Sequence, residues 1–109
     1  MRRYGLVVLF AACGTSSLFG GPIFGNIFYQ GQALRGAPIT ISCPGGGGRG
    51  ATLDDGSYRI HVQAQGNCTL MVSSPAGAVS APVVSTSAAA QYNFAVAPKP
   101  GGGWELRRQ

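Results

Sequence analysis

The side chains that could carry acid–base or metal chemistry are few. The acidic residues are Asp54, Asp55 and Glu105, and His61 is the single histidine. Asp54 and Asp55 could bind a cation or transfer a proton, but a calcium loop needs several oxygen ligands at alternating spacing. An acid pair of the glycosidase kind would have to recruit the distant Glu105. We therefore interpret Asp55-Gly56 as a tight hairpin turn between two strands.

His61 is the remaining candidate for catalysis or metal binding. A metal site would need further His, Cys or acidic ligands beside it. The G-x-S-x-G motif, whose serine is the nucleophile of many Ser-His-Asp triads, would indicate such a triad, and the sequence contains none. His61 also takes the outward phase of its strand pattern, so we interpret it as a surface residue. The sequence predicts no enzyme, no catalytic or metal-binding residue and no cofactor.

A glycine-rich segment, PGGGGRG at 44–50, formally contains the spacing of a dinucleotide fingerprint at Gly45, Gly47 and Gly50. That motif needs a helix after it, so that phosphate meets the helix N-terminus, and here a strand pattern follows. We predict a mobile loop at one end of the domain. Loops of this kind often bind ligands, which makes Arg49 a candidate for contact with an acidic partner.

The N-terminus, MRRYGLVVLFAACGTSS, has the order of a secretory signal. Two arginines precede an apolar run that ends at Ala12, and small residues follow. The run is far shorter than the roughly 20 residues that cross a bilayer, and a buried strand is the alternative interpretation. We predict a signal peptide over residues 1–12 and a flexible tether over residues 13–21.

The residues Phe10-Ala11-Ala12-Cys13 resemble a bacterial lipobox, in which the cysteine becomes the lipid-bearing first residue of the mature chain. The match is partial, because the usual leucine stands one place early, at Leu9. Ordinary cleavage near Gly14 is the alternative. Cys13 is therefore a candidate lipidation site that would anchor the protein to a membrane.

The cysteines, Cys13, Cys43 and Cys68, are odd in number, which leaves one thiol to explain in an exported protein. If Cys13 carries lipid or leaves with the signal, the other two remain as a pair. Cys43 is in phase with the apolar residues before it and Cys68 with those after it, so both sulfurs should point inward. If their strands run antiparallel side by side, a Cys43–Cys68 disulfide forms, as an oxidising compartment permits.

From Pro22 onward the chain shows short alternating apolar and polar runs with turn residues between them. Seven or eight such runs follow one another at spacings near ten residues, and none has a helical period. This pattern is typical of an antiparallel β-sandwich. We predict one all-β domain over residues 22–109 that ends in a basic strand or tail.

The charge distribution limits the partners. Formal net charge is +5, but without Arg2 and Arg3 it is +3, spread along the chain. Nucleic-acid binding needs clustered cations, so we predict no nucleic-acid partner. The tail residues Arg107 and Arg108 could touch anionic lipid or a partner. We interpret Trp104 as a core residue, with a sugar-binding platform as the alternative.

The order of short motifs resembles the carboxypeptidase regulatory-like domain family. The motifs are Gly25-Asn26-Ile27, Gly36-Ala37-Pro38-Ile39-Thr40-Ile41, the segment from Ala51 to Ile60, and Cys68-Thr69-Leu70-Met71-Val72. The resemblance covers about residues 22–97. It implies a seven-stranded Greek-key sandwich similar to transthyretin, in which the second and fifth strands, here the carriers of Cys43 and Cys68, are neighbours. It also implies a non-catalytic spacer, stabiliser or docking role.

Together these observations predict a non-catalytic exported module of the bacterial cell envelope. It would be a small lipoprotein of the periplasm or outer membrane, or alternatively a secreted protein, with a structural or docking role. The alternatives are a subunit of an envelope secretion or assembly machine and a carbohydrate-binding module. The expected partner is an envelope protein or a glycan, besides the membrane.

Overall fold

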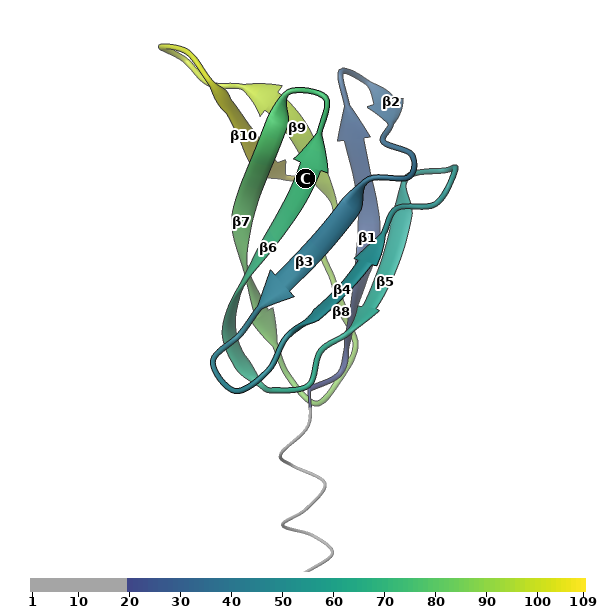
Figure 1. Cartoon of the computed structure of the whole chain (residues 1–109), viewed down its shortest axis with the longest axis vertical. Helices are drawn as coiled ribbons and strands as arrows, with labels where there is room; N and C mark the ends of the chain where they lie inside the picture. The colour runs from purple at the N-terminus through teal and green to yellow at the C-terminus, as the bar shows by residue number, and fades with distance from the viewer. Residues whose placement is uncertain (1–19) are drawn as a thin grey trace, which may run out of the picture.

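The computed structural model describes residues 20–109, which form ten β-strands and no helix (Figure 1). The predicted signal peptide, the lipid-acceptor candidate Cys13 and the tether up to residue 19 lie outside the described residues. The last two tether residues are joined to the domain, because the amides of Gly20 and Gly21 donate to the carbonyls of Gln63 and Thr86. Pro22 then begins the first strand.

The strands form two sheets. A six-stranded sheet has the order β10-β9-β1-β2, with β5 and β8 also paired to β1, and a four-stranded sheet has the order β4-β3-β6-β7. The bounds are β1 Pro22–Tyr29, β2 Gln32–Ala33, β3 Pro38–Ser42, β4 Gly48–Ala51, β5 Ser57–His61, β6 Gly66–Ser74, β7 Gly77–Ser85, β8 Ala90–Gln91, β9 Phe94–Pro98 and β10 Trp104–Arg108.

Alternating side chains from both sheets fill one interior, as the sequence pattern predicts. Ile39 and Ile41 of β3 and Leu70 and Val72 of β6 are buried, whereas the residues between them are exposed. Successive side chains of a strand point to opposite faces, so one parity of each strand lies inside. The described residues therefore form an all-β, sandwich-like fold with one core (buried hydrophobics Ile23, Ile27, Leu34, Ala37, Ile39, Ile41, Tyr58, Ile60, Val62, Cys68, Leu70, Val72, Val79, Ala81, Val83, Phe94, Val96 and Leu106).

The prediction that every pair of strands is antiparallel is wrong for the central strand. β1 runs parallel to β8 and β9, with Ile23 opposite Ala90 and Ile27 opposite Phe94. β1 and β9 are remote in the sequence, so no short turn forces the chain to reverse between them. Alternation shows which side chains are buried but carries no information about the direction of a distant neighbour.

The ten strands exceed the seven or eight predicted because short pieces escape a periodicity argument. β2 and β8 have two residues each. Moreover, β8 and β9 share one register along β1 and are interrupted only at Tyr92 and Asn93. The parity of Tyr92, Phe94 and Val96 continues through the interruption, so the sequence predicts one strand there.

The predicted disulfide is confirmed and joins β3 to β6. These strands are antiparallel, and their last pair is Ser42 opposite Thr69. Cys43 and Cys68 extend that register by one position, with a Cα–Cα distance of 4.4 Å and a sulfur–sulfur bond of 2.08 Å. Cys68 is buried and Cys43 packs partly against the core. The bond therefore lies within one sheet, at the inner face that the parity argument predicts.

Contacts join the two sheets at one open side and at one end of the sandwich. At the side, the Tyr92 hydroxyl accepts a hydrogen bond of 2.9 Å from the amide of Val84 in the edge strand β7. At the end, the amide of Ala64, in the loop after β5, donates to the carbonyl of Gly46, in the loop after β3, at 3.1 Å. β7 also contains Pro82, which lacks an amide proton and is tolerated at an edge. The β7 edge is therefore partly covered, which limits pairing with another chain.

Candidate functional site

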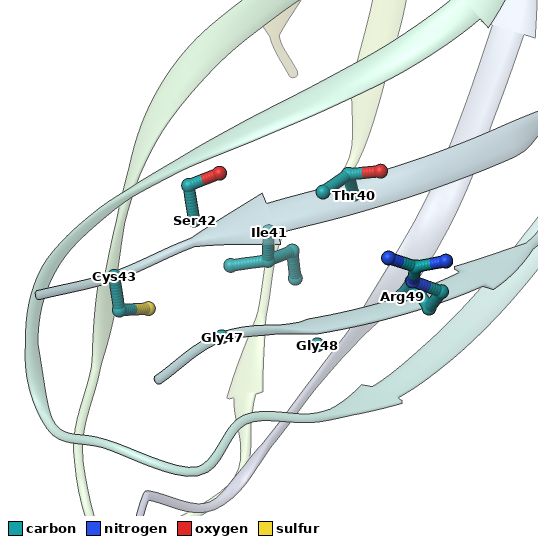
Figure 2. Close-up of a pocket in the computed structure, with 7 residues that line it drawn as sticks. All are labelled: Thr40, Ile41, Ser42, Cys43, Gly47, Gly48 and Arg49. Carbon is teal, nitrogen blue, oxygen red and sulfur yellow. The ribbon is translucent and has the colours of Figure 1, made fainter. Parts of the chain in front are cut away.

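A shallow hollow of about 410 Å³ lies over the β3–β4 pair (Figure 2). Thr40, Ser42 and Arg49 extend to one side of this pair, whereas Ile41 and Cys43 point to the opposite side, toward the interior. The hollow is therefore on the outer face of the four-stranded sheet. Its lining residues are Thr40, Ile41, Ser42, Cys43, Gly47, Gly48 and Arg49.

The pairing of β3 with β4, together with one glycine, explains why this space is open. Thr40 of β3 stands directly opposite Arg49 of β4, and Ile41 stands opposite Gly48. The next position opposite Ser42 is thus Gly47, which has no side chain. A Cβ at Gly47 would collide with the carbonyl oxygen of Ile41, so a larger residue cannot fill this space without a backbone shift. The space beside Ser42 stays open as a result.

The donors at this hollow are a guanidinium and two hydroxyls. Arg49 is exposed, and the ion pair found within residues 20–109 joins Glu105 to Arg107, not Arg49 to an acid. No carboxylate lines the hollow. Guanidinium and hydroxyl groups together suit an oxyanion, since the guanidinium fork matches two acceptor oxygens.

The prediction that Arg49 lies in a loop is wrong. It lies in β4, and the glycine-rich segment gives its last residues to that strand. Glycine is depleted in strands, so composition predicts a loop where backbone pairing to β3 makes a strand. Sequence reasoning missed Thr40 and Ser42 as site residues, although their outward parity on β3 was the signal that could have found them.

The acidic pair lies in a tight turn, as predicted, but that turn does not form a hairpin. The Gly56 amide donates to the Leu53 carbonyl at 2.9 Å, and Gly56 has a φ of 82°. β4 before it belongs to the four-stranded sheet and β5 after it to the six-stranded sheet. The turn therefore carries the chain from one sheet to the other, a distinction that turn residues alone do not reveal.

Asp55 stabilises this turn through its carboxylate. Its Oδ1 accepts hydrogen bonds from the hydroxyl of Ser57 at 2.6 Å and from the amide of Ser57 at 3.0 Å. These bonds, the side-chain bond first, lower the pKa of the Asp55 carboxyl. A second open hollow, of about 540 Å³, lies beside the turn and is lined by Thr52, Leu53, Asp54 and Asp55.

The remaining sequence candidates are not gathered at the hollow. Trp104 of β10 is half-buried and packs against Tyr29, with ring centroids 5.6 Å apart. Arg107 bonds Glu105 through Nε at 3.1 Å, and Arg108 lies over the Tyr92 ring at 4.3 Å. β10 belongs to the other sheet from β4, so the structure separates the tail arginines from Arg49.

No protein-family model matches the chain, and no curated protein matches its sequence. Within residues 20–109, no three His, Cys, Asp or Glu side chains gather in a group that could hold a metal ion. In the same range, no helix is long and apolar enough to span a membrane.

The two sheets present different outer surfaces. Arg49 is the only charged residue in the strands β3, β4, β6 and β7. The strands of the other sheet carry Arg59, His61, Glu105, Arg107 and Arg108. The outer face of the four-stranded sheet is thus a surface of small polar and apolar side chains with one cation near its β4 edge (exposed residues Pro38, Thr40, Ser42, Arg49, Ala51, Asn67, Thr69, Met71, Ser73, Ala78, Ser80, Pro82 and Val84).

Proposed function

We propose that this chain is a non-catalytic, exported module of the bacterial cell envelope with a docking or structural role. The observation that carries the proposal is the Cys43–Cys68 bond between adjacent strands at the inner face of the sheet. Disulfides persist in oxidising compartments and are rare in the cytosol. Small exported domains use such bonds because their cores alone give limited stability.

A non-catalytic role is supported by what the reactive residues do in the fold. Asp55 accepts two hydrogen bonds from Ser57 within its turn, and His61 is exposed at the end of β5. The pKa shift of Asp55 is downward, whereas a general acid at neutral pH needs an upward one. These properties suit a structural turn and a surface position.

We further propose that the fold is a transthyretin-like Greek-key sandwich of the carboxypeptidase regulatory-like kind. The proposal rests on the motifs quoted above and on the antiparallel adjacency of the two cysteine-bearing strands, which the resemblance implies. In that kind of domain the sandwich acts as a spacer, stabiliser or docking unit.

We propose that the module is held at a membrane by a lipid on Cys13. The support is the lipobox-like order of residues 10–13 and the short distance in sequence from Cys13 to Gly20, the first described residue, whose amide bonds to the domain. Arg107 and Arg108 add two cations at the end of β10 that could contact anionic lipid or a partner. The alternative is a soluble secreted protein cleaved near Gly14.

Carbohydrate binding through Trp104 is less well supported. A sugar platform needs an exposed aromatic face, and the Trp104 ring packs on Tyr29 and against the core. The partner of the docking module is therefore proposed to be a protein of the envelope, including a subunit of a secretion or assembly machine.

Intact-mass measurement of the native protein from a bacterial membrane fraction tests the proposal. We expect a chain that begins at Cys13, carries the mass of a lipid modification and is lighter by two hydrogen atoms than the reduced form, because of the Cys43–Cys68 bond. The matched variant is Cys13→Ala, which should leave the membrane fraction but keep the disulfide. A full-length chain recovered from the cytosol with both thiols free would contradict export.

A further inference from the structure

We propose that the hollow formed by Thr40, Ser42 and Arg49 binds a phosphate group. The group would be the head-group phosphate of an anionic lipid or a free phosphate. The proposal goes beyond the docking role and is independent of it, except that the lipid source rests on the proposed membrane anchor.

The first support is that three donor side chains share one face. The Thr40 and Ser42 hydroxyls and the Arg49 guanidinium lie on one side of the β3–β4 pair, with Thr40 directly opposite Arg49 (Figure 2). A phosphate has more acceptor oxygens than a carboxylate. It can therefore engage the two-pronged guanidinium and still accept from a hydroxyl.

The second support is the space kept open by Gly47. This residue stands at the position opposite Ser42, and its close approach to the Ile41 carbonyl excludes a side chain there. The resulting volume of about 410 Å³ is ample for a phosphate and part of the group that carries it. Arg35 is likewise exposed and has no ion pair among the described residues, but it does not line this hollow.

The third support is electrostatic. Arg49 is the only charged residue in the four strands of its sheet, so no neighbouring strand residue of that sheet neutralises it. The surrounding outer face is uncharged and carries hydroxyls. An anion that reaches this face therefore meets one positive centre with hydroxyl donors beside it and no competing carboxylate in the lining.

The hollow lies toward the end of the domain at which the chain enters, which is the end that a lipid anchor would hold near a membrane. Gly20, the first described residue, bonds to Gln63, and the next residue of that loop, Ala64, bonds to Gly46. The chain thus enters the domain at the same end as the loop between β3 and β4 (Figure 1). A lipid on Cys13 would place this end toward the membrane, where lipid phosphates are concentrated.

The test is an amide NMR titration of the disulfide-bonded Cys13→Ala protein with inorganic phosphate, at constant ionic strength kept with sodium chloride. We expect saturable shifts at residues 40–42 and 47–49. Arg49→Gln should weaken phosphate binding by about tenfold or more, since charge-assisted hydrogen bonds are lost. Arg35→Gln is the matched control and should bind as the parent does.

Two further variants and one further ligand sharpen the test. Thr40→Val is nearly isosteric, and Ser42→Ala removes only a hydroxyl, so each should weaken binding by about threefold without changing the fold. Acetate should bind more weakly than phosphate. Equal binding of acetate, equal losses in the Arg35 and Arg49 variants, or no saturable shift would each overturn the phosphate site.

Vesicle flotation separates the two sources of phosphate. If the ligand is a lipid head group, the Cys13→Ala protein should float with phosphatidylglycerol vesicles, and Arg49→Gln should reduce flotation more than Arg35→Gln. If the ligand is free phosphate, the NMR effects persist while the two variants float equally. Export is measured separately by intact mass, so failure of this site would not be confused with failure of the proposed function.

Discussion

The hydroxyl of Tyr58 donates a hydrogen bond of 2.6 Å to the main-chain carbonyl of Tyr92, across the intervening strand β1. Tyr58 in β5 stands opposite Gly25 in β1, and the Tyr92 amide bonds to Phe24 on the far side of β1. The missing side chain at Gly25 lets the tyrosine ring pass over the strand. This bond links β5 to the interruption between β8 and β9.

Gly25→Ala should therefore destabilise the domain strongly. A Cβ at Gly25 would collide with the Tyr92 carbonyl, which is main chain and cannot rotate away. We expect a loss of about 2–3 kcal/mol in the free energy of unfolding, measured by urea denaturation. The matched control is Gly50→Ala in β4, where the nearest atoms belong to the side chain of Ile60. If the two substitutions destabilised the domain equally, the close passage of Tyr58 and the Tyr92 carbonyl at Gly25 would be contradicted.

Tyr58→Phe should cost about 1 kcal/mol at neutral pH, because the Tyr92 carbonyl loses its donor. Burial, and then the nearby Tyr92, raises the pKa of Tyr58. The fold thus favours the neutral phenol, so stability is full below the unfolded pKa of about 10 and falls as the pH rises above it. Unfolding in urea from pH 8 to 11.5 should show a smaller alkaline loss in the variant. The same alkaline slope in both proteins would exclude this role for Tyr58.

Reduction of the Cys43–Cys68 bond should lower the free energy of unfolding by about 3 kcal/mol, because the bond closes a 25-residue separation. Denaturation with and without dithiothreitol measures the difference. The double variant Cys43→Ala, Cys68→Ala should match the reduced protein and be insensitive to the reductant. A variant as stable as the oxidised protein would show that the bond is dispensable.

Asp55→Asn should reduce the sensitivity of the fold to acid. The pKa of Asp55 is lowered in the fold by its bonds to Ser57, so its stabilising effect is present above the unfolded pKa, about 4. The effect is lost as the pH falls through the lower folded value. Urea denaturation between pH 5 and pH 2 should show a shallower decline in the variant. An unchanged slope in the variant would contradict this role for Asp55.

Trp104→Ala should act on stability, with an expected loss of about 2 kcal/mol in the free energy of unfolding, because the ring packs on Tyr29 and the core. Trp104→Phe should recover much of that loss. Thermal denaturation of the two variants measures the effect. A fully stable Trp104→Ala protein that loses glycan binding on an array would instead favour the carbohydrate-binding alternative.

Of the residues at the candidate site, the sequence identified Arg49 but not its neighbours. Its charge and its glycine-rich surroundings indicated contact with an acidic partner, but the predicted loop is in part the strand β4. The neighbours Thr40 and Ser42 lie on β3, and only strand register brings them beside Arg49. Register depends on main-chain pairing between segments, which a residue-by-residue pattern does not contain.

Parity along each strand was determined by the sequence alone, because a strand presents alternate side chains to opposite faces whatever it pairs with. That parity placed Ile39, Ile41, Leu70 and Val72 inside and brought Cys43 and Cys68 to the same face. Only the tertiary structure decided that β1 runs parallel to β9 and that the Asp55 turn links two sheets. Those choices depend on packing between segments remote in sequence, where no local preference selects the neighbour.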